Sequence, residues 1–349
     1  MCKYNIINIK KMYGEKIVLN NITFEIEDGD FIVIAGPSGC GKSTLLKIIA
    51  GFINSDGGDI IKHGASIRNT KVSDRNISMV FQEAALFDHM SVYENIIYGL
   101  KYSGVSKYEC KKRAYNFMKM LHIGKLANQQ AETLSGGEKQ RVSIARALVR
   151  NPDIFLLDEP FSALDTRLKS ELRGELKQLH QQMKKTYVYV THDQQEAMML
   201  ATKLIILNEG KIQQIGVPQE LYRKPNNLFV ANFLGKYQLN TIEGRINNKK
   251  ILHKERVVAN TAQEKESSCI IGFREHDIIF DEDGMLGEIV LIDDLGNERY
   301  YHVYVYEYEK RFVVKGLLYD NKKIGQKVYL KFQWEYALYF DKDNHGCII

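Results

Sequence analysis

Residues 31–50 read FIVIAGPSGCGKSTLLKIIA, and this stretch decides the fold. The opening FIVIA is apolar and rich in β-branched residues, which indicates a buried strand, and LLKIIA favours a helix. Between them, residues 36–44 fit G-x-x-x-x-G-K-[ST], a phosphate loop. Such a loop directs backbone amides and a helix N-terminus at phosphate oxygens. A simple glycine-rich turn is the alternative, but the full match between a strand and a helix favours a nucleotide site.

Two side chains of this loop have specific predicted roles. Lys42 supplies a positive charge for the β- and γ-phosphates, and Ser43 supplies a hydroxyl for Mg²⁺. The predicted nucleotide-binding residues of the loop are Gly36, Pro37, Ser38, Gly39, Cys40, Gly41, Lys42, Ser43 and Thr44.

Short apolar segments downstream predict the remaining strands. Residues 154–158, 186–190 and 203–208 are apolar and alternate with segments of helical character, and residues 91–147 are largely helical in pattern. Apolar strands alternating with helices are typical of an α/β fold with a mainly parallel sheet. The sequence therefore predicts an α/β P-loop NTPase domain.

Two adjacent acids follow the first of these strands. Asp158 and Glu159 come at its carboxyl end, where phosphate and metal chemistry gathers in open α/β sheets. Asp158 suits the Mg²⁺ shell, and Glu159 suits a base or positioning group for an attacking water. A solvated turn is the alternative; the preceding phosphate loop favours the functional interpretation.

The segment LSGGEKQR, residues 134–141, predicts a second anion site. Ser-Gly-Gly before a helix combines a hydroxyl, bare backbone amides and a helix N-terminus. An ordinary helix cap made by Ser135 is equally compatible with the residues alone.

LSGGEKQR resembles the signature motif of ABC ATPases, and further elements of that family occur in the family's order. Tyr13 matches the aromatic residue that stacks on adenine, Gln82 the Q-loop, and His192 the switch histidine. Ser162-Ala163-Leu164-Asp165 matches the D-loop. The resemblance implies ATP and Mg²⁺ as ligands, with Gln82 both catalytic and a metal ligand.

The resemblance also implies a dimer. Ser135 and Gly137 of one copy would bind the γ-phosphate held by Lys42 of the other, with Gly136 and Asp165 at the same nucleotide. His192 would hold the water and Glu159 in line. Residues 83–100 would dock a membrane partner.

After about residue 234 the pattern changes to short β segments, which predicts a second domain. YYHVYVYEY at 300–308 and KVYLKFQ at 327–333 read as strands, with turns at Asp283-Gly284 and 295–297. We expect an ATPase domain over 1–235, with a helical subdomain at about 84–148, and a β-rich regulatory domain over 236–349.

Two segments narrow the resemblance to importer subunits of the maltose, glycerol-phosphate and polyamine type. They are residues 211–235, which close the ATPase domain, and GFREHDI at 272–278, which resembles the core of a C-terminal TOBE-type domain built on OB-like barrels. This chain has Glu275 where that group usually has proline.

Composition sets limits on location and partners. The 349 residues carry a net charge of +5 with both signs mixed, which gives no argument for nucleic acid. Five cysteines without metal-ligand spacing favour a reduced, cytosolic compartment. The N-terminus is too polar for a signal peptide, and no stretch approaches ~18 apolar residues. We expect a peripheral protein on the cytoplasmic face of the membrane.

The sequence thus predicts the ATP-hydrolysing subunit of an importer. Its expected partners are a second copy, transmembrane permease subunits that are identical or different, and indirectly an extracytoplasmic solute-binding protein. Carbohydrate is the expected cargo; polyamine or ferric iron are alternatives, as is a non-transport ABC ATPase. The single phosphate loop argues against the last of these.

Overall fold

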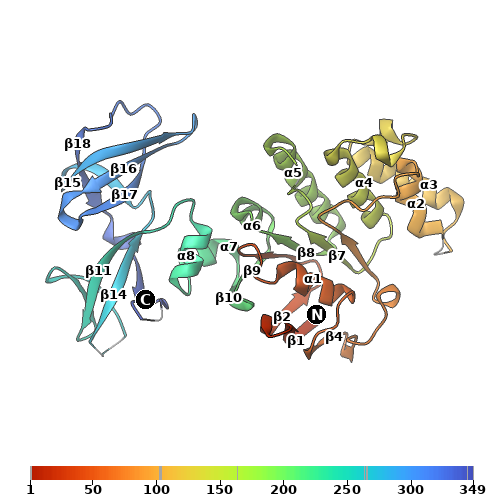
Figure 1. Cartoon of the computed structure of the whole chain (residues 1–349), viewed down its shortest axis with the longest axis horizontal. Coiled ribbons are helices and arrows are strands. Elements are labelled where there is room, and N and C mark those ends of the chain that lie inside the picture. The colour runs from red at the N-terminus through yellow and green to blue at the C-terminus, as the bar shows by residue number, and fades with distance from the viewer. Residues whose placement is uncertain are drawn as a thin grey trace. The chain divides into compact units, whose positions relative to one another are not determined.

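The computed structural model describes residues 2–101, 104–162, 164–262, 264, 266–343 and 345–348. The chain forms two compact units, Met1–Pro218 and Gln219–Ile349, shown in Figure 1. Each unit has its own hydrophobic core and its own sheets.

The centre of the first unit is a six-stranded sheet with the order β10-β9-β3-β8-β7-β6. Five strands pair in parallel, and β10 pairs antiparallel with β9 at one edge. All residues of β3 and β7 are buried, as expected of strands covered on both faces. The predicted mainly parallel α/β sheet is confirmed. Its strands are β3 (Phe31–Ala35), β6 (Ile77–Val80), β7 (Ile154–Asp158), β8 (Thr186–Thr191), β9 (Lys203–Asn208) and β10 (Lys211–Gly216).

A second sheet of the same unit is antiparallel, with the order β2-β1-β4-β5. Its strands are β1 (Cys2–Tyr13), β2 (Lys16–Glu27), β4 (Gly57–Lys62) and β5 (Ala65–Ser66). Helix α1 (Lys42–Ala50) shares one apolar core with both sheets, which fixes the start of this helix against β3.

The helices cover the remaining faces of the first unit. The predicted helical stretch contains α2 (Val92–Lys101), α3 (Lys107–Met120) and α4 (Gly136–Leu148). Helix α5 (Thr166–Met183) follows β7, and α6 (Gln194–Leu200) packs on β3 and β8. Short 3₁₀ turns lie at Val72–Asp74, Gly124–Leu126 and Ala131–Thr133.

The second unit contains two antiparallel sheets around one core, as expected for an OB-like all-β domain. One sheet has the order β13-β12-β11-β14-β19 and the other β17-β16-β15-β18. The strands are β11 (Asn240–Asn247), β12 (Lys250–His253), β13 (Arg256–Asn260), β14 (Ser267–Phe273), β15 (Ile278–Asp294), β16 (Arg299–Val305), β17 (Lys310–Gly316), β18 (Lys327–Phe332) and β19 (Leu338–Asp341), with 3₁₀ turns at Tyr306–Tyr308 and Trp334–Tyr336.

The expected turn at Asp283-Gly284 is wrong, because these residues lie inside the long strand β15. Leu330 pairs with both Phe280 and Met285, so the residues between them form a bulge rather than a reversal. A Cβ on Gly284 would stand 2.5 Å from the carbonyl oxygen of Leu330. The glycine therefore permits close approach of two strands. In the sequence alone, such an Asp-Gly pair resembles a turn.

The domain boundary that we expected at residue 235 stays a prediction. The two compact units of the structure divide after Pro218. Helices α7 (Pro218–Arg223) and α8 (Leu228–Leu234) are joined to the β region by the buried Arg274. Its guanidinium donates to the carbonyls of Tyr222 and Ala231 and lies 3.6 Å from the Tyr222 ring centroid. These bonds attach α8 and the part of α7 after Pro218 to the second unit.

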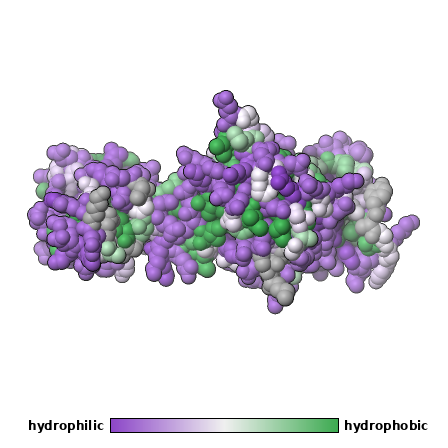
Figure 2. Space-filling view, turned by 90° about the horizontal axis from the view of Figure 1, so that it is seen from below, coloured by the Kyte–Doolittle hydropathy of each residue, from purple (hydrophilic) through white to green (hydrophobic). Residues whose placement is uncertain are grey.

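Polar side chains prevail on the face shown in Figure 2, where apolar residues form separate patches. Among the described residues, no helix has the length and apolar character needed to cross a membrane.

Candidate nucleotide-binding and hydrolysis site

The strand register brings four predicted motifs to one edge of the central sheet. Ala35 of β3 pairs with Thr191 of β8, and Val190 pairs with Asp158 of β7. Leu157 in turn pairs with Val80 of β6. Because these strands are parallel and end in register, the segments that follow them leave the sheet side by side. The phosphate loop, Gln82, Glu159 and His192 all lie in those segments.

The phosphate loop is closely packed around its lysine. Lys42 is 4% exposed, and its Nζ donates to the carbonyls of Gly36 and Pro37 at 2.9 and 2.8 Å. Gly41 has φ 107° and a Cβ there would stand 2.7 Å from the carbonyl oxygen of Val18. A glycine is therefore required for the loop to enter α1. The helix N-terminus and the lysine provide positive potential in one place.

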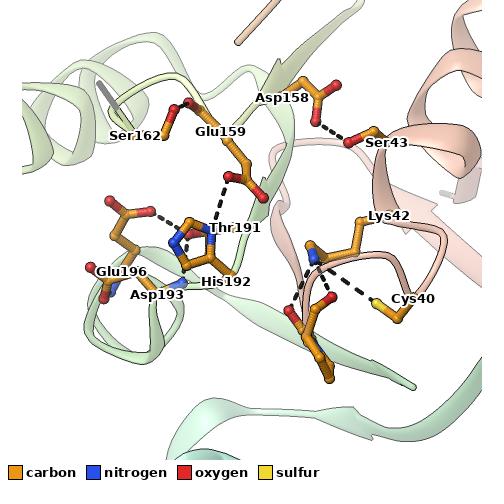
Figure 3. Close-up of polar contacts among 12 residues, drawn as sticks. Cys40, Lys42, Ser43, Asp158, Glu159, Ser162, Thr191, His192, Asp193 and Glu196 are labelled. Carbon is orange, nitrogen blue, oxygen red and sulfur yellow. Dashed lines mark hydrogen bonds and ion pairs between the residues drawn. The ribbon is translucent and has the colours of Figure 1, made fainter. Parts of the chain in front are cut away.

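Ser43 and Asp158 connect the loop to the end of β7. The Ser43 hydroxyl donates to Asp158 Oδ1 at 2.7 Å (Figure 3). Burial raises the pKa of the Asp158 carboxyl, against the lowering effect of the Ser43 hydrogen bond. A hydroxyl and a carboxylate are hard oxygen ligands of the kind that Mg²⁺ uses together with substrate phosphates. These two oxygens therefore fit a cation whose remaining ligands are phosphate and water.

Glu159 and His192 face each other at the ends of β7 and β8. Nδ1 of His192 lies 2.9 Å from Oε2 of Glu159, as Figure 3 shows. The Glu159 backbone has φ 44°, a left-handed conformation fixed by hydrogen bonds from its amide to Val190 and from Ser162 to its carbonyl. A strained backbone held on both sides is typical of functional positions. The histidine side chain is 53% exposed and so is open to a ligand.

A pocket of about 330 Å³ adjoins the phosphate loop. Residues 16–18, 37–40 and 208–210 line it. Tyr13 is the last residue of β1 and lies close in sequence to residues 16–18 of the pocket. It is 50% exposed, and Lys11 Nζ lies 5.4 Å from its ring centroid. An exposed aromatic ring is available for stacking on a base.

Gln82 is exposed in the loop after β6, and helix α4 holds this loop. Arg146 donates to the carbonyls of Ala85 and Ala84 at 2.9 and 3.1 Å, and Gln140 donates to Phe81 at 3.5 Å. The loop that carries Gln82 is thereby attached to the helix that begins at the Ser-Gly-Gly turn.

The Ser-Gly-Gly turn is a helix cap, and its first two residues, Ser135 and Gly136, are exposed, whereas Gly137 is half-buried. Ser135 caps α4, and its hydroxyl and Glu138 form a reciprocal capping box. The hydrogen bond from Ser135 lowers the pKa of Glu138. A Cβ on Gly136 would meet nothing within 4 Å, so this glycine is not explained by packing within the chain. Figure 1 shows helix α4 apart from helix α1, the helix into which the phosphate loop leads.

Asp165 caps α5 by accepting a hydrogen bond from Leu168 N at 3.0 Å and is exposed. Of the predicted D-loop, Ala163 lies outside the described residues. Thr44 follows Ser43 in the first turn of α1, and Ser38 and Gly39 are exposed at the tip of the loop.

One part of the site was missed by the sequence analysis. Arg173, Asp193 and Glu196 form a cluster of charged side chains directly behind His192. Arg173 and Glu196 fall on helices, where a charged residue ordinarily indicates a solvated face. The only sequence signal is that Arg173 interrupts the apolar side of α5 next to Leu172.

Comparison with known proteins defines the class. Residues 19–162 match the ABC transporter family. The Fe(3+) ions import ATP-binding protein FbpC of Fusobacterium nucleatum is 38% identical over 98% of this chain and 94% of its own length. The maltose/maltodextrin import ATP-binding protein MalK of Yersinia pestis is 39% identical over 87% of this chain and 86% of its own.

A solved structure of similar fold is a dimer of the ATP-binding cassette MJ0796 in a post-hydrolysis state with ADP and Pi. It is 33% identical with a TM-score of 0.56 and covers 62% of this chain and 98% of its own. The chain belongs to the ATP-binding proteins of ABC transporters. It is therefore an ATPase.

Proposed function

We propose that this chain is the ATP-hydrolysing subunit of an importer that works as a two-fold dimer. The observation that carries the proposal is the in-register edge of the central sheet, where Ala35, Val80, Asp158 and Thr191 end neighbouring strands. This edge places a phosphate loop, an oxygen pair for a cation and a carboxylate–imidazole pair next to one another.

The residues of this edge have distinct roles. Residues 36–44 bind the phosphates, and Lys42 places its charge at the β- and γ-phosphates. Ser43, Asp158 and Gln82 hold Mg²⁺, which neutralises phosphate charge when bound. Tyr13 stacks on the adenine at the pocket beside the loop.

Glu159 orients the attacking water or accepts its proton, and His192 holds the carboxylate in position. Their 2.9 Å contact supports this pairing, since a catalytic base is typically oriented by a hydrogen-bonded neighbour.

A second copy completes the nucleotide site. Ser135 and Gly137 of one copy, with Gly136 between them, bind the γ-phosphate held by Lys42 of the other, and Asp165 lies at the same interface. Two observations support this: Ser135 and Gly136 are exposed, and Gly136 has open space where a side chain would stand. The dimeric cassette of similar fold supports it as well. ATP bound between two copies stabilises the closed dimer, and hydrolysis loosens it.

The loop of Gln82 transmits the state of the nucleotide. Arg146 and Gln140 attach this loop to α4, so the loop and the Ser-Gly-Gly turn move together. We place the docking site of transmembrane permease subunits at residues 83–100, which gives the chain a peripheral position on the cytoplasmic face of the membrane.

The cargo we propose is a carbohydrate, delivered by an extracytoplasmic solute-binding protein. The likeness to MalK supports it, and the equal likeness to FbpC makes ferric iron the second candidate. The region 236–349 acts as a regulatory domain of the TOBE type; the buried Arg274, within GFREHDI, supports a structural role for that motif.

The test is purification of the full chain with its membrane complex, followed by identification of the solute-binding protein that stimulates its ATPase activity in vesicles. A sugar-loaded protein is the expected stimulator. An iron- or polyamine-loaded protein would overturn the carbohydrate assignment, and a complex without permease subunits would overturn the importer.

A further inference from the structure

A buried carboxylate lies behind the switch histidine. Glu196 is 4% exposed and accepts four hydrogen bonds. Two come from Nε and Nη2 of Arg173 at 3.1 and 2.9 Å, one from the Tyr189 hydroxyl at 2.8 Å, and one from the Thr191 hydroxyl at 2.5 Å. We call these four residues with Asp193 the Glu196 cluster. A carboxylate this buried is tolerable only when its oxygens are fully paired, as they are here.

The Thr191 hydroxyl fixes the chain on both sides of His192. It donates to Glu196 and accepts from the amide of Asp193 at 2.9 Å (Figure 3). This single oxygen therefore connects the residue before His192 to the residue after it. Asp193 is held further by Arg173 Nη2 at 2.6 Å and by the amides of Gln195 and Glu196. The backbone that carries His192 is thus fixed at both neighbours.

The histidine ring has little support of its own. Its side chain is 53% exposed, and its ring nitrogen Nδ1 contacts Oε2 of Glu159. A catalytic contact needs its groups held within about 0.5 Å, and rigid neighbours usually provide this. Buried ion clusters add little stability compared with apolar packing, so their best-supported use is to specify one arrangement.

We propose that Thr191 is a positioning residue for His192: through the Glu196 cluster, its hydroxyl aims the imidazole at Glu159. This inference rests on the proposed role of His192 in hydrolysis.

The direct test compares Thr191→Val with Thr191→Ser in the full chain. Valine keeps the branched shape of the side chain and removes the hydroxyl, whereas serine keeps the hydroxyl. We expect Thr191→Val to lower kcat for ATP about tenfold, since small misplacements of catalytic groups cost this much or more. KM for ATP stays within about twofold because residues 36–44 are untouched. Thr191→Ser retains near wild-type kcat.

Two controls separate positioning from loss of stability. Val188→Ala removes a buried side chain of the same strand β8 outside the cluster, and it should lower the melting temperature while leaving kcat unchanged. Glu196→Gln perturbs the cluster from its other end and should lower kcat at constant KM, which keeps the test open if Thr191→Val folds poorly.

A double-mutant cycle completes the experiment. In a His192→Ala background, Thr191→Val should cause no further loss of kcat, because both changes act through one imidazole. If the losses of kcat in the two single variants add in the double variant, the inference is overturned. It is also overturned if His192→Ala lowers kcat but Thr191→Val leaves kcat unchanged. If His192→Ala itself keeps full kcat, the proposed role of the histidine fails instead.

Discussion

Nδ1 of His192 and Oε2 of Glu159 lie 2.9 Å apart at the carboxyl ends of neighbouring parallel strands. This contact joins the two residues that we assign to the attacking water. It exists because β7 and β8 end in register, so the residues after them emerge together.

Replacing Glu159 by glutamine should stop turnover and keep ATP binding. The amide keeps the size of the side chain and removes the carboxylate that orients water, so kcat falls by about 10² or more. The trapped ATP state should elute as a dimer on a sizing column with ATP and Mg²⁺. Glu282→Gln, an exposed change in the second unit, is the control and should hydrolyse ATP normally. A monomeric Glu159→Gln protein under these conditions would contradict the dimer.

Lys42→Ala should abolish ATP binding measured by calorimetry. It removes the charge nearest the β- and γ-phosphates, and it also removes two hydrogen bonds to Gly36 and Pro37, each of about 1 kcal/mol. Lys10→Ala, on an exposed position of β1, should bind ATP like the wild type. Unchanged affinity in Lys42→Ala would count against the phosphate loop.

Ser135→Arg should abolish hydrolysis with little effect on ATP binding, because it blocks the turn that meets the partner's nucleotide. It also loses a helix cap, which costs about 1 kcal/mol. Ser106→Arg is the matched control, since the Ser106 hydroxyl also caps a helix, α3, by accepting a hydrogen bond from Glu109 N, and it should remain active.

Mixing Ser135→Arg with Lys42→Ala chains extends this test. A mixed dimer has one intact composite site at most, so some hydrolysis should return in the mixture. Full activity of Ser135→Arg alone would contradict the role of the turn.

Asp158→Asn should make the nucleotide-free protein more stable while abolishing Mg²⁺-dependent hydrolysis. Burial raises the pKa of Asp158, so the folded state favours the neutral form. Stability from this group is therefore present at low pH and lost as pH rises through the folded pKa. Asparagine keeps an acceptor for Ser43 and carries no charge, so the gain should reach about 1 kcal/mol above that pKa. Melting temperatures of both proteins across a pH series measure it; a gain that shrinks as pH rises would contradict the sign.

The fold of the first unit was predictable from the sequence because its strands are buried on both faces and read as apolar runs. β3 and β7 show this directly. In the second unit, β18 alternates as expected, with Val328, Leu330 and Phe332 buried. The bulge at Gly284 was not predictable, since a glycine that admits a neighbouring strand resembles one that permits a turn.

The residues of the site were predictable from the sequence where short motifs carry the chemistry. The way in which these residues are arranged in space was not predictable. Register decides that Asp158 lies beside Val190, and no single segment encodes that pairing. The Glu196 cluster was missed because Arg173 and Glu196 belong to different helices. Their mutual burial exists only in the folded chain.

The most direct test of the composite site is a structure of Glu159→Gln with ATP and Mg²⁺. We expect a two-fold dimer in which Ser135 and Gly137 of one copy lie within hydrogen-bond distance of the γ-phosphate bound at Lys42 of the other. A γ-phosphate surrounded by residues of one copy alone, with the Ser-Gly-Gly turns facing solvent, would contradict the account.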